Sequence, residues 1–135
     1  MSIKLEGLDE LLKLLEEKSN VDLTEPLGKA CALVEAAAIQ NAPKGTGELR
    51  RSINSKVEDN KGIVFTPLEY APYVEYGTGL FAEEGGRKDV PWNYQDEKGE
   101  WHRTSGMKPQ PFMRPALNDN REKIIELLKE GIING

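Results

Sequence analysis

The N-terminal part of the chain shows two patterns of apolar positions, which predict different elements. Residues 3–7 alternate apolar and polar side chains and end at a glycine, which favours a short strand. Over residues 8–18 the leucines recur at helical spacing, which predicts an amphipathic helix. Asp22 has capping-box spacing with Glu25, and a stripe of small apolar residues follows it. The stripe predicts an alanine-rich helix that ends near Asn41 and lies flat on a sheet or another helix.

Two segments farther along carry the pattern of β-hairpins. Residues 53–58 alternate, residues 59–62 have turn chemistry, and residues 63–65 resume an apolar run. In the second segment, aromatic positions alternate on both sides of a turn at residues 96–99. Its aromatic side chains are expected to pair across the two strands; these are Trp92, Tyr94 and Trp101.

The connector at 44–53 and the C-terminal region complete the predicted fold. A helical turn is expected around residues 48–51 with Thr46 as its cap. A final helix is expected to begin near Pro115, and Gly131 should weaken its end. We therefore predict an α+β fold in which two β-hairpins form an antiparallel sheet, covered by the alanine-rich helix and the C-terminal helix.

The length of the chain predicts how many domains these elements form. A chain of 135 residues favours one domain with one hydrophobic core, here residues 1–135. Residues 80–89 combine paired charges and paired glycines without periodicity, which predicts a mobile loop within that domain.

Charge and composition argue against several classes of function. The net charge of −5 gives the chain no general attraction to nucleic acid or to anionic membranes. No apolar run approaches the roughly 20 residues that span a bilayer, and the first residues lack the apolar region of a signal peptide, so we expect a cytoplasmic protein. The single cysteine, Cys31, lies among alanines and leucines and is expected to be a buried thiol.

The segment from Tyr70 to Gly79 concentrates the most unusual chemistry of the chain. It holds three tyrosines, one carboxylate, a proline and two glycines within ten residues. Pro72 favours a helical first turn and Gly77 can adopt the left-handed conformation that closes it. We expect a rigid corner or assembly surface, in which the tyrosines form a semi-buried platform around Glu75 and this carboxylate accepts hydrogen bonds.

An enzymatic interpretation competes with this one. A small metal-dependent hydrolase or nuclease would use Glu75 with Asp89 or Glu83. The sequence favours the structural interpretation, because one acid without a nearby histidine or a second fixed acid is poor acid–base machinery. His102 is the only histidine, and we expect it to be solvated rather than catalytic or metal-binding.

A proline-rich segment, residues 109–117, is expected to lie beside residues 70–79. Its backbone is largely fixed before folding, so Phe112 and Met113 would lose little entropy in a contact. Arg114 could then orient that contact through a carboxylate of a neighbouring copy. The equally weighted alternative is that Phe112 fills the core beneath the last helix.

Three ordered motifs resemble a known protein family. They are Ala42-Pro-Lys-Gly-Thr-Gly-Glu-Leu-Arg-Arg-Ser-Ile53, Tyr70-Ala-Pro-Tyr-Val-Glu-Tyr-Gly-Thr-Gly79 and Pro109-Gln-Pro-Phe-Met-Arg-Pro-Ala-Leu117. In this order they are similar to the signature of the head-tail joining or tail-completion proteins of tailed phages and prophages. The likeness extends from the Gly7-Leu-Asp-Glu-Leu11 opening to the last helix, and the chain is less typical in residues 80–89 and in the length of the second hairpin.

The resemblance implies a non-enzymatic virion protein without a cofactor. Copies of such a protein form a ring at the junction of head and tail, between the connector or adaptor and the tail tube or tail terminator proteins, and let DNA pass. It would be made in the cytoplasm of the bacterial host and would bind neither a specific nucleic acid sequence nor a membrane. Side chains from the three motifs are the expected contact residues: Arg50, Tyr73, Glu75, Tyr76, Gly77, Thr78, Phe112 and Arg114.

Overall fold

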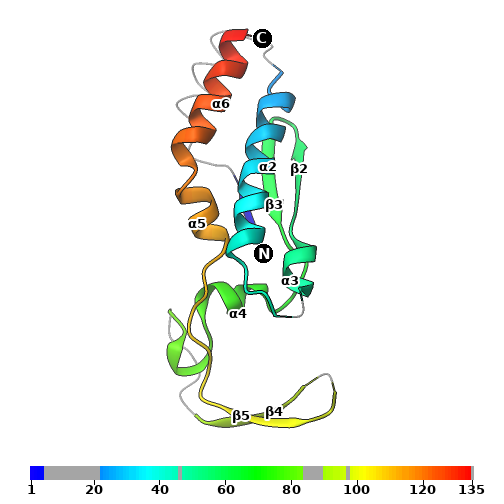
Figure 1. Cartoon of the computed structure of the whole chain (residues 1–135), viewed down its shortest axis with the longest axis vertical. Coiled ribbons are helices and arrows are strands. Elements are labelled where there is room, and N and C mark those ends of the chain that lie inside the picture. The colour runs from blue at the N-terminus through cyan, green and yellow to red at the C-terminus, as the bar shows by residue number, and fades with distance from the viewer. Residues whose placement is uncertain (5–21, 46, 84–89, 97, 135) are drawn as a thin grey trace. The chain divides into compact units, whose positions relative to one another are not determined.

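The computed structural model describes residues 1–4, 22–45, 47–83, 90–96 and 98–134. They form two compact units, one made of Met1–Pro67 with Phe112–Gly135 and the other of Leu68–Pro111 (Figure 1). The helix predicted over 8–18 lies outside the described residues, as do most of the strand predicted over 3–7 and most of the loop predicted at 80–89. The prediction of a single domain stays a prediction, and the two units are described separately below.

The first unit contains a three-stranded antiparallel sheet in the order β1-β3-β2. Its strands are β1 (Ser2–Lys4), β2 (Asn54–Glu58) and β3 (Lys61–Phe65). Val64 of the central strand pairs with Ile3 on one side and Ser55 on the other. The tight turn between β2 and β3 is Asp59-Asn60, whose φ angles are 50° and 58°. Asp and Asn tolerate this left-handed region, so the first predicted hairpin is confirmed with a two-residue turn.

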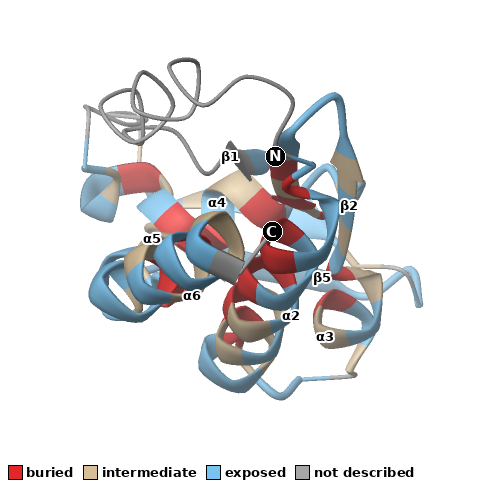
Figure 2. Cartoon of the chain, turned by 90° about the horizontal axis from the view of Figure 1, so that it is seen from above, coloured by how far each residue is buried: buried red, intermediate tan, exposed pale blue. Residues whose placement is uncertain are grey.

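Helix α2 (Thr24–Asn41) lies between the sheet and the C-terminal helices. One side of α2 packs on β2 and β3, and the other packs on α5 (Met113–Asn118) and α6 (Arg121–Asn134), as Figure 1 shows. The buried residues of α2 are small or medium in size, which permits contact on both sides (Figure 2): Pro26, Leu27, Ala30, Cys31, Val34 and Ala38. The flat, alanine-rich packing predicted from the sequence is confirmed, but α6 covers α2 rather than the sheet.

The start of α2 differs from the predicted capping box. The Asp22 carboxylate accepts hydrogen bonds from the backbone N–H and the hydroxyl of Thr24, at 2.9 and 2.6 Å. These bonds lower the pKa of Asp22. Glu25 instead forms an exposed ion pair with Lys29 at 3.6 Å, so the acid at the third capping position points along the helix surface.

The predicted C-terminal helix is divided in two. Asn120 Nδ2 donates to the Ala116 carbonyl at 2.8 Å and so ends α5, while the Asn120 carbonyl accepts the N–H of Ile124 and begins α6. Asn competes for backbone hydrogen bonds in this way and is therefore a poor residue for a helix interior. The first helix begins two residues before Pro115.

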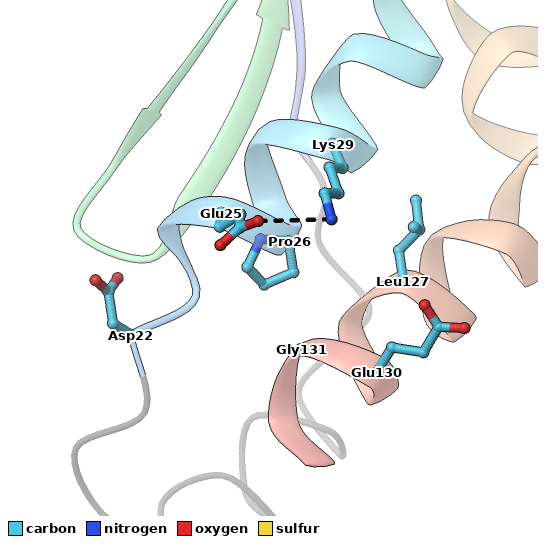
Figure 3. Close-up of a pocket in the computed structure, with 7 residues that line it drawn as sticks. All are labelled: Asp22, Glu25, Pro26, Lys29, Leu127, Glu130 and Gly131. Atoms are coloured by element: carbon cyan, nitrogen blue, oxygen red, sulfur yellow. Dashed lines mark ion pairs between the residues drawn. The ribbon is translucent and has the colours of Figure 1, made fainter. Parts of the chain in front are cut away.

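Gly131 marks the crossing of α6 and α2 rather than a weak helix end. A Cβ at this position would come within 2.6 Å of the Pro26 ring, and α6 continues beyond it to Asn134. Beside the crossing, a hollow of about 220 Å³ is lined by Asp22, Glu25, Pro26, Lys29, Leu127, Glu130 and Gly131 (Figure 3). Its acids, Asp22, Glu25 and Glu130, are exposed surface groups.

The second unit holds the remaining elements. They are α4 (Ala71–Tyr76), the 3-10 turn η1 (Gly79–Phe81), and the antiparallel pair β4 (Trp92–Gln95) and β5 (Trp101–Thr104). The α+β class and both hairpins are therefore confirmed. The prediction that the two hairpins form one sheet is wrong in detail, because β4 and β5 make a separate two-stranded sheet.

Candidate interaction surface

The turn predicted at the Tyr70–Gly79 motif is present as α4. Pro72 lies in its first turn, and the Gly77 N–H donates to the Tyr73 carbonyl at 2.9 Å to close it. Gly77 has φ 83° and ψ 173°, so its φ is positive as expected but its ψ is extended rather than left-handed. This combination is nearly exclusive to glycine, which explains why the turn requires glycine at this position.

From Val74 in α4 onward, the chain pairs with residues 105–110 through an irregular ladder of hydrogen bonds. Gln110 N donates to Val74 O at 2.8 Å, Thr78 N to Met107 O at 2.9 Å, and Leu80 N to Ser105 O at 3.0 Å. The Thr78 hydroxyl accepts a further bond from the N–H of Met107 at 2.9 Å. The sequence prediction that the second and third motifs lie side by side is thus confirmed for the part of the third motif that includes Gln110.

Two glycines make this ladder possible. Gly79 and Gly106 have φ of 60° and 124°, and their Cα atoms face each other across the two segments. A Cβ on Gly79 would overlap the Ser105 carbonyl oxygen, and a Cβ on Gly106 would overlap the carbonyl oxygen of Thr78. The backbones approach so closely that only glycine fits at either position.

Glu75 is fully buried, whereas the sequence suggested a semi-buried platform. No buried side-chain nitrogen or oxygen among the described residues lacks a hydrogen-bond partner, which includes the Glu75 carboxylate. A buried, hydrogen-bonded carboxylate holds structure in place, because losing a partner would leave a desolvated charge. Of the acids considered with it for catalysis, Glu83 is exposed and Asp89 lies outside the described residues.

The tyrosines of the motif are partly exposed to solvent. Tyr73 is 59% exposed and Tyr76 40%, and Leu80 and Phe81 of the following turn are 60% and 40% exposed. We call these four side chains the aromatic patch. Lys108 Nζ lies 6.0 Å from the centre of the Phe81 ring at one side of the patch. Apolar side chains that stay exposed on a rigid turn are typical of an interaction surface.

Arg50 has a structural role that the sequence analysis did not anticipate. It lies in α3 (Glu48–Ser52), the predicted helical turn, which begins after Gly47; the proposed cap, Thr46, lies outside the described residues. The Arg50 guanidinium donates from Nε to the Ala42 carbonyl at 3.0 Å and from Nη2 to the Gln40 carbonyl at 3.2 Å. It therefore caps the C-terminus of α2, where carbonyl groups lack helical partners.

Phe112 and Met113 belong to the core of the first unit. Both side chains are fully buried, and Asn41 Nδ2 of α2 donates to the Phe112 carbonyl at 3.4 Å. The structure thus agrees with the alternative in which Phe112 fills the core. Arg114 is half-buried and has an interaction partner within the chain, and its part in an intermolecular contact stays a prediction.

The two-stranded sheet, with its turn, forms a ribbon whose register differs from the predicted aromatic pairing. Tyr94 pairs with His102, and their rings stack with centroids 5.3 Å apart, whereas Trp101 pairs with Gln95 and Trp92 with Thr104. The prediction of contacts among the three aromatic residues is therefore wrong. A one-residue difference in register moves a side chain to the opposite face, and composition alone does not fix that register.

The turn of the ribbon is organised by one carboxylate. Asp96 accepts the backbone N–H groups of Lys98 and Glu100, both at 2.9 Å, and pairs with His102 Nε2 at 2.6 Å. The bond to His102 is the largest cause that lowers the pKa of Asp96. Asp96, Glu100 and His102 lie close enough together to share a cation, but the hydrogen bonds of Asp96 already account for this arrangement.

Among the described residues, no helix is both long and apolar enough to cross a membrane.

Comparison with known proteins identifies the chain through its first two motifs. The family described as "Bacteriophage HK97-gp10, putative tail-component" matches residues 6–77, which is more than half of the chain. No curated protein and no solved structure gives a significant match. The chain belongs to the HK97-gp10-like family of bacteriophage tail components.

Proposed function

We propose that this phage tail component forms a ring at the junction of head and tail, where it completes the connector or tail and lets DNA pass. The observation that carries the proposal is the aromatic patch on a turn fixed by glycines. A rigid turn loses little conformational entropy when it binds, and tyrosine is enriched among interface residues that dominate binding energy. The patch would contact a neighbouring copy or one of the flanking connector and tail proteins.

The acidic balance of the chain fits a position around passing DNA. A neck ring must let the genome move without gripping it, and every phosphate that a protein neutralises adds salt-dependent affinity. The net charge of −5 disfavours such binding. Tight binding of the purified protein to duplex DNA at physiological salt would contradict this part of the proposal.

Particle assembly tests the main proposal. Tyr73→Glu places a charge in the middle of the patch and should leave the fold intact, because Tyr73 is mostly exposed. We expect phages that carry this variant to yield unjoined heads and tails in electron micrographs. Lys98→Glu in the ribbon turn is the control and should assemble normally. An image of the wild-type particle that locates the protein away from the neck would refute the proposal.

The Glu75→Gln variant separates the structural role from the hydrolase alternative. Removing the charge from a fully buried carboxylate changes its hydrogen bonds, so we expect a lower midpoint of thermal unfolding or impaired assembly. A variant that folds and assembles normally but loses a metal-dependent hydrolytic activity of the wild type would instead establish catalysis by Glu75.

A further inference from the structure

The ribbon carries a second exposed surface, on the side opposite the Tyr94–His102 stack. Residues directly opposite each other in an antiparallel pair share a face, so Asn93, Arg103, Gln95 and Trp101 lie on one face of the ribbon. We call it the Trp101 face. On the other face, the Trp92 ring lies against Gly79, so that face turns toward the hydrogen-bonded ladder and the Trp101 face turns away from it.

The Trp101 face is built from residue types that dominate interfaces, and it is uncovered. Trp101 is 70% exposed, and together with Asn93, His102 and Arg103 it lines a shallow hollow. The Arg103 side chain is exposed, and no hydrogen bond or ion pair joins its guanidinium to another described residue. Tryptophan and arginine are the residues most enriched among binding hot spots.

The ribbon is small for a sheet, and hydrogen bonds join the described residues on both sides of its turn. Within the described chain it has only two strands, and an isolated two-stranded sheet is at best marginally stable in water. Its turn is nevertheless held by Asp96 and by the Gln95 side chain, whose Nε2 donates to the Gly99 carbonyl at 2.9 Å. A preorganised arm with an uncovered tryptophan gains stability when a partner covers it.

We propose that the Trp101 face of one copy docks on the aromatic patch of the next copy. The chemistry of the two surfaces is complementary: the Trp101 ring would be buried against Leu80 and Phe81, and the Arg103 guanidinium would lie over the exposed tyrosine rings. Lys108 already occupies the Phe81 side of the patch, so Arg103 is placed at Tyr73 and Tyr76. The exposed Glu69, next to the Tyr70–Gly79 motif in sequence, favours an approaching cation.

The two surfaces are different patches of the same unit, so the contact is heterologous. Each copy offers one ribbon and one patch, and repetition of a heterologous contact generates a closed ring or an open helix. The inference rests on the proposed ring and names the residues that would join its subunits.

Crosslinking between two differently tagged full-length chains tests the contact. One chain carries Asn93→Cys, on the same face as Trp101 but with the Trp101 ring kept, and the other carries Tyr76→Cys; a short bismaleimide reagent joins thiols that come together. The native Cys31 is buried, so its background reaction should be low. We expect a product between the two chains, and its loss when Arg103→Glu is added. Tyr94→Cys, on the opposite face of the ribbon, is the matched control and should give several-fold less product.

Three results would overturn the inference: no product between the chains, equal product from Tyr94→Cys, or preferential joining of two Asn93→Cys chains. Unchanged circular dichroism and thermal unfolding confirm that each variant is folded. The outcome is independent of where the protein lies in the virion. If crosslinking succeeds and imaging places the protein elsewhere in the tail, the contact stands and the neck assignment fails. If imaging confirms the neck and crosslinking fails, only the contact is refuted.

Discussion

At the scale of single residues, glycines determine the geometry of the second unit. Gly77 is predictable as a turn residue, because a glycine after a short helical run is a local signal. The approach of Gly79 to Gly106 is not predictable in this way, since it joins positions far apart in the chain. Only long-range contacts distinguish a glycine that the backbone requires from one that merely tolerates substitution.

Gly79→Ala should destabilise the second unit. The new Cβ would overlap the Ser105 carbonyl, and alanine disfavours a φ of 60°, so we expect a cost of at least about 2 kcal/mol. Thermal unfolding and faster hydrogen exchange of the Leu80 N–H would report it. The matched control is Gly28→Ala in α2, where a Cβ meets nothing within 4 Å. That variant should be more stable by about 0.5–1 kcal/mol, and equal effects of the two substitutions would contradict the explanation.

Asp96 should make the order of the ribbon sensitive to acid. Hydrogen bonds hold the folded pKa of Asp96 below its ordinary value of 3.8. A group with a depressed folded pKa contributes stability above its unfolded pKa and loses it as the pH falls through the folded value. We therefore expect the ribbon to be ordered at neutral pH and to loosen progressively as the pH falls below 3.8 and through the lower folded pKa. Carboxyl NMR titration checks this, and a pKa of Asp96 at or above the ordinary value would contradict it.

At the scale of elements, local sequence patterns predicted which helices and hairpins form, whereas long-range contacts decided how these elements join. The alanine stripe of α2 and the turn chemistry at Asp59-Asn60 were sufficient to place a helix and a hairpin. The separation of the two hairpins into different sheets and the register of the ribbon depend on pairing partners that no local pattern specifies. The break between α5 and α6 depends on the Asn120 side chain, which donates a hydrogen bond to a backbone carbonyl. Helix propensity alone predicts such a break only weakly.

The same limit applies to the candidate site. The motif with Tyr73, Glu75 and Tyr76 was identified from composition, since few surface loops need that mixture of residues. Composition could not decide which side chains face inward, and the structure buries Glu75 while exposing the tyrosines. Arg50 is predicted from the sequence only as a contact residue, because its acceptors at the end of α2 are recognised only once α3 is folded beside them.

Arg50→Ala should weaken the junction of α2 and α3. Two carbonyl groups at the end of α2 lose a charged donor, for an expected cost of about 1–2 kcal/mol in the free energy of unfolding. Denaturant titration measures it. The free energy of unfolding of Arg50→Lys should fall between those of the wild type and Arg50→Ala, because one ammonium group cannot make both hydrogen bonds of the forked guanidinium. Arg103→Ala is the control, exposed and without a bonded partner in the described chain, and should change stability by less than about 0.5 kcal/mol. Equal effects of Arg50→Ala and Arg103→Ala would exclude the capping role.

At the scale of the whole molecule, the proposed contacts between copies must be weak enough that free copies stay apart until assembly begins. The aromatic patch and the Trp101 face each consist of a few exposed side chains, which is a small area for an interface that is stable alone. Each copy carries a net charge of −5, so identical copies repel one another. A neighbouring virion protein that holds several copies together would raise their effective concentration and overcome both limits.

The isolated chain should therefore be mainly monomeric at micromolar concentration. Light scattering coupled to gel filtration should give a mass near 15.1 kDa, with weak association that increases as added salt screens the repulsion between copies. Trp101→Ala should abolish that residual association, whereas Tyr94→Ala, on the other face of the ribbon, should leave it unchanged. A stable closed ring as the only species at low salt would contradict this prediction, because the subunit contact would then need no partner to assemble.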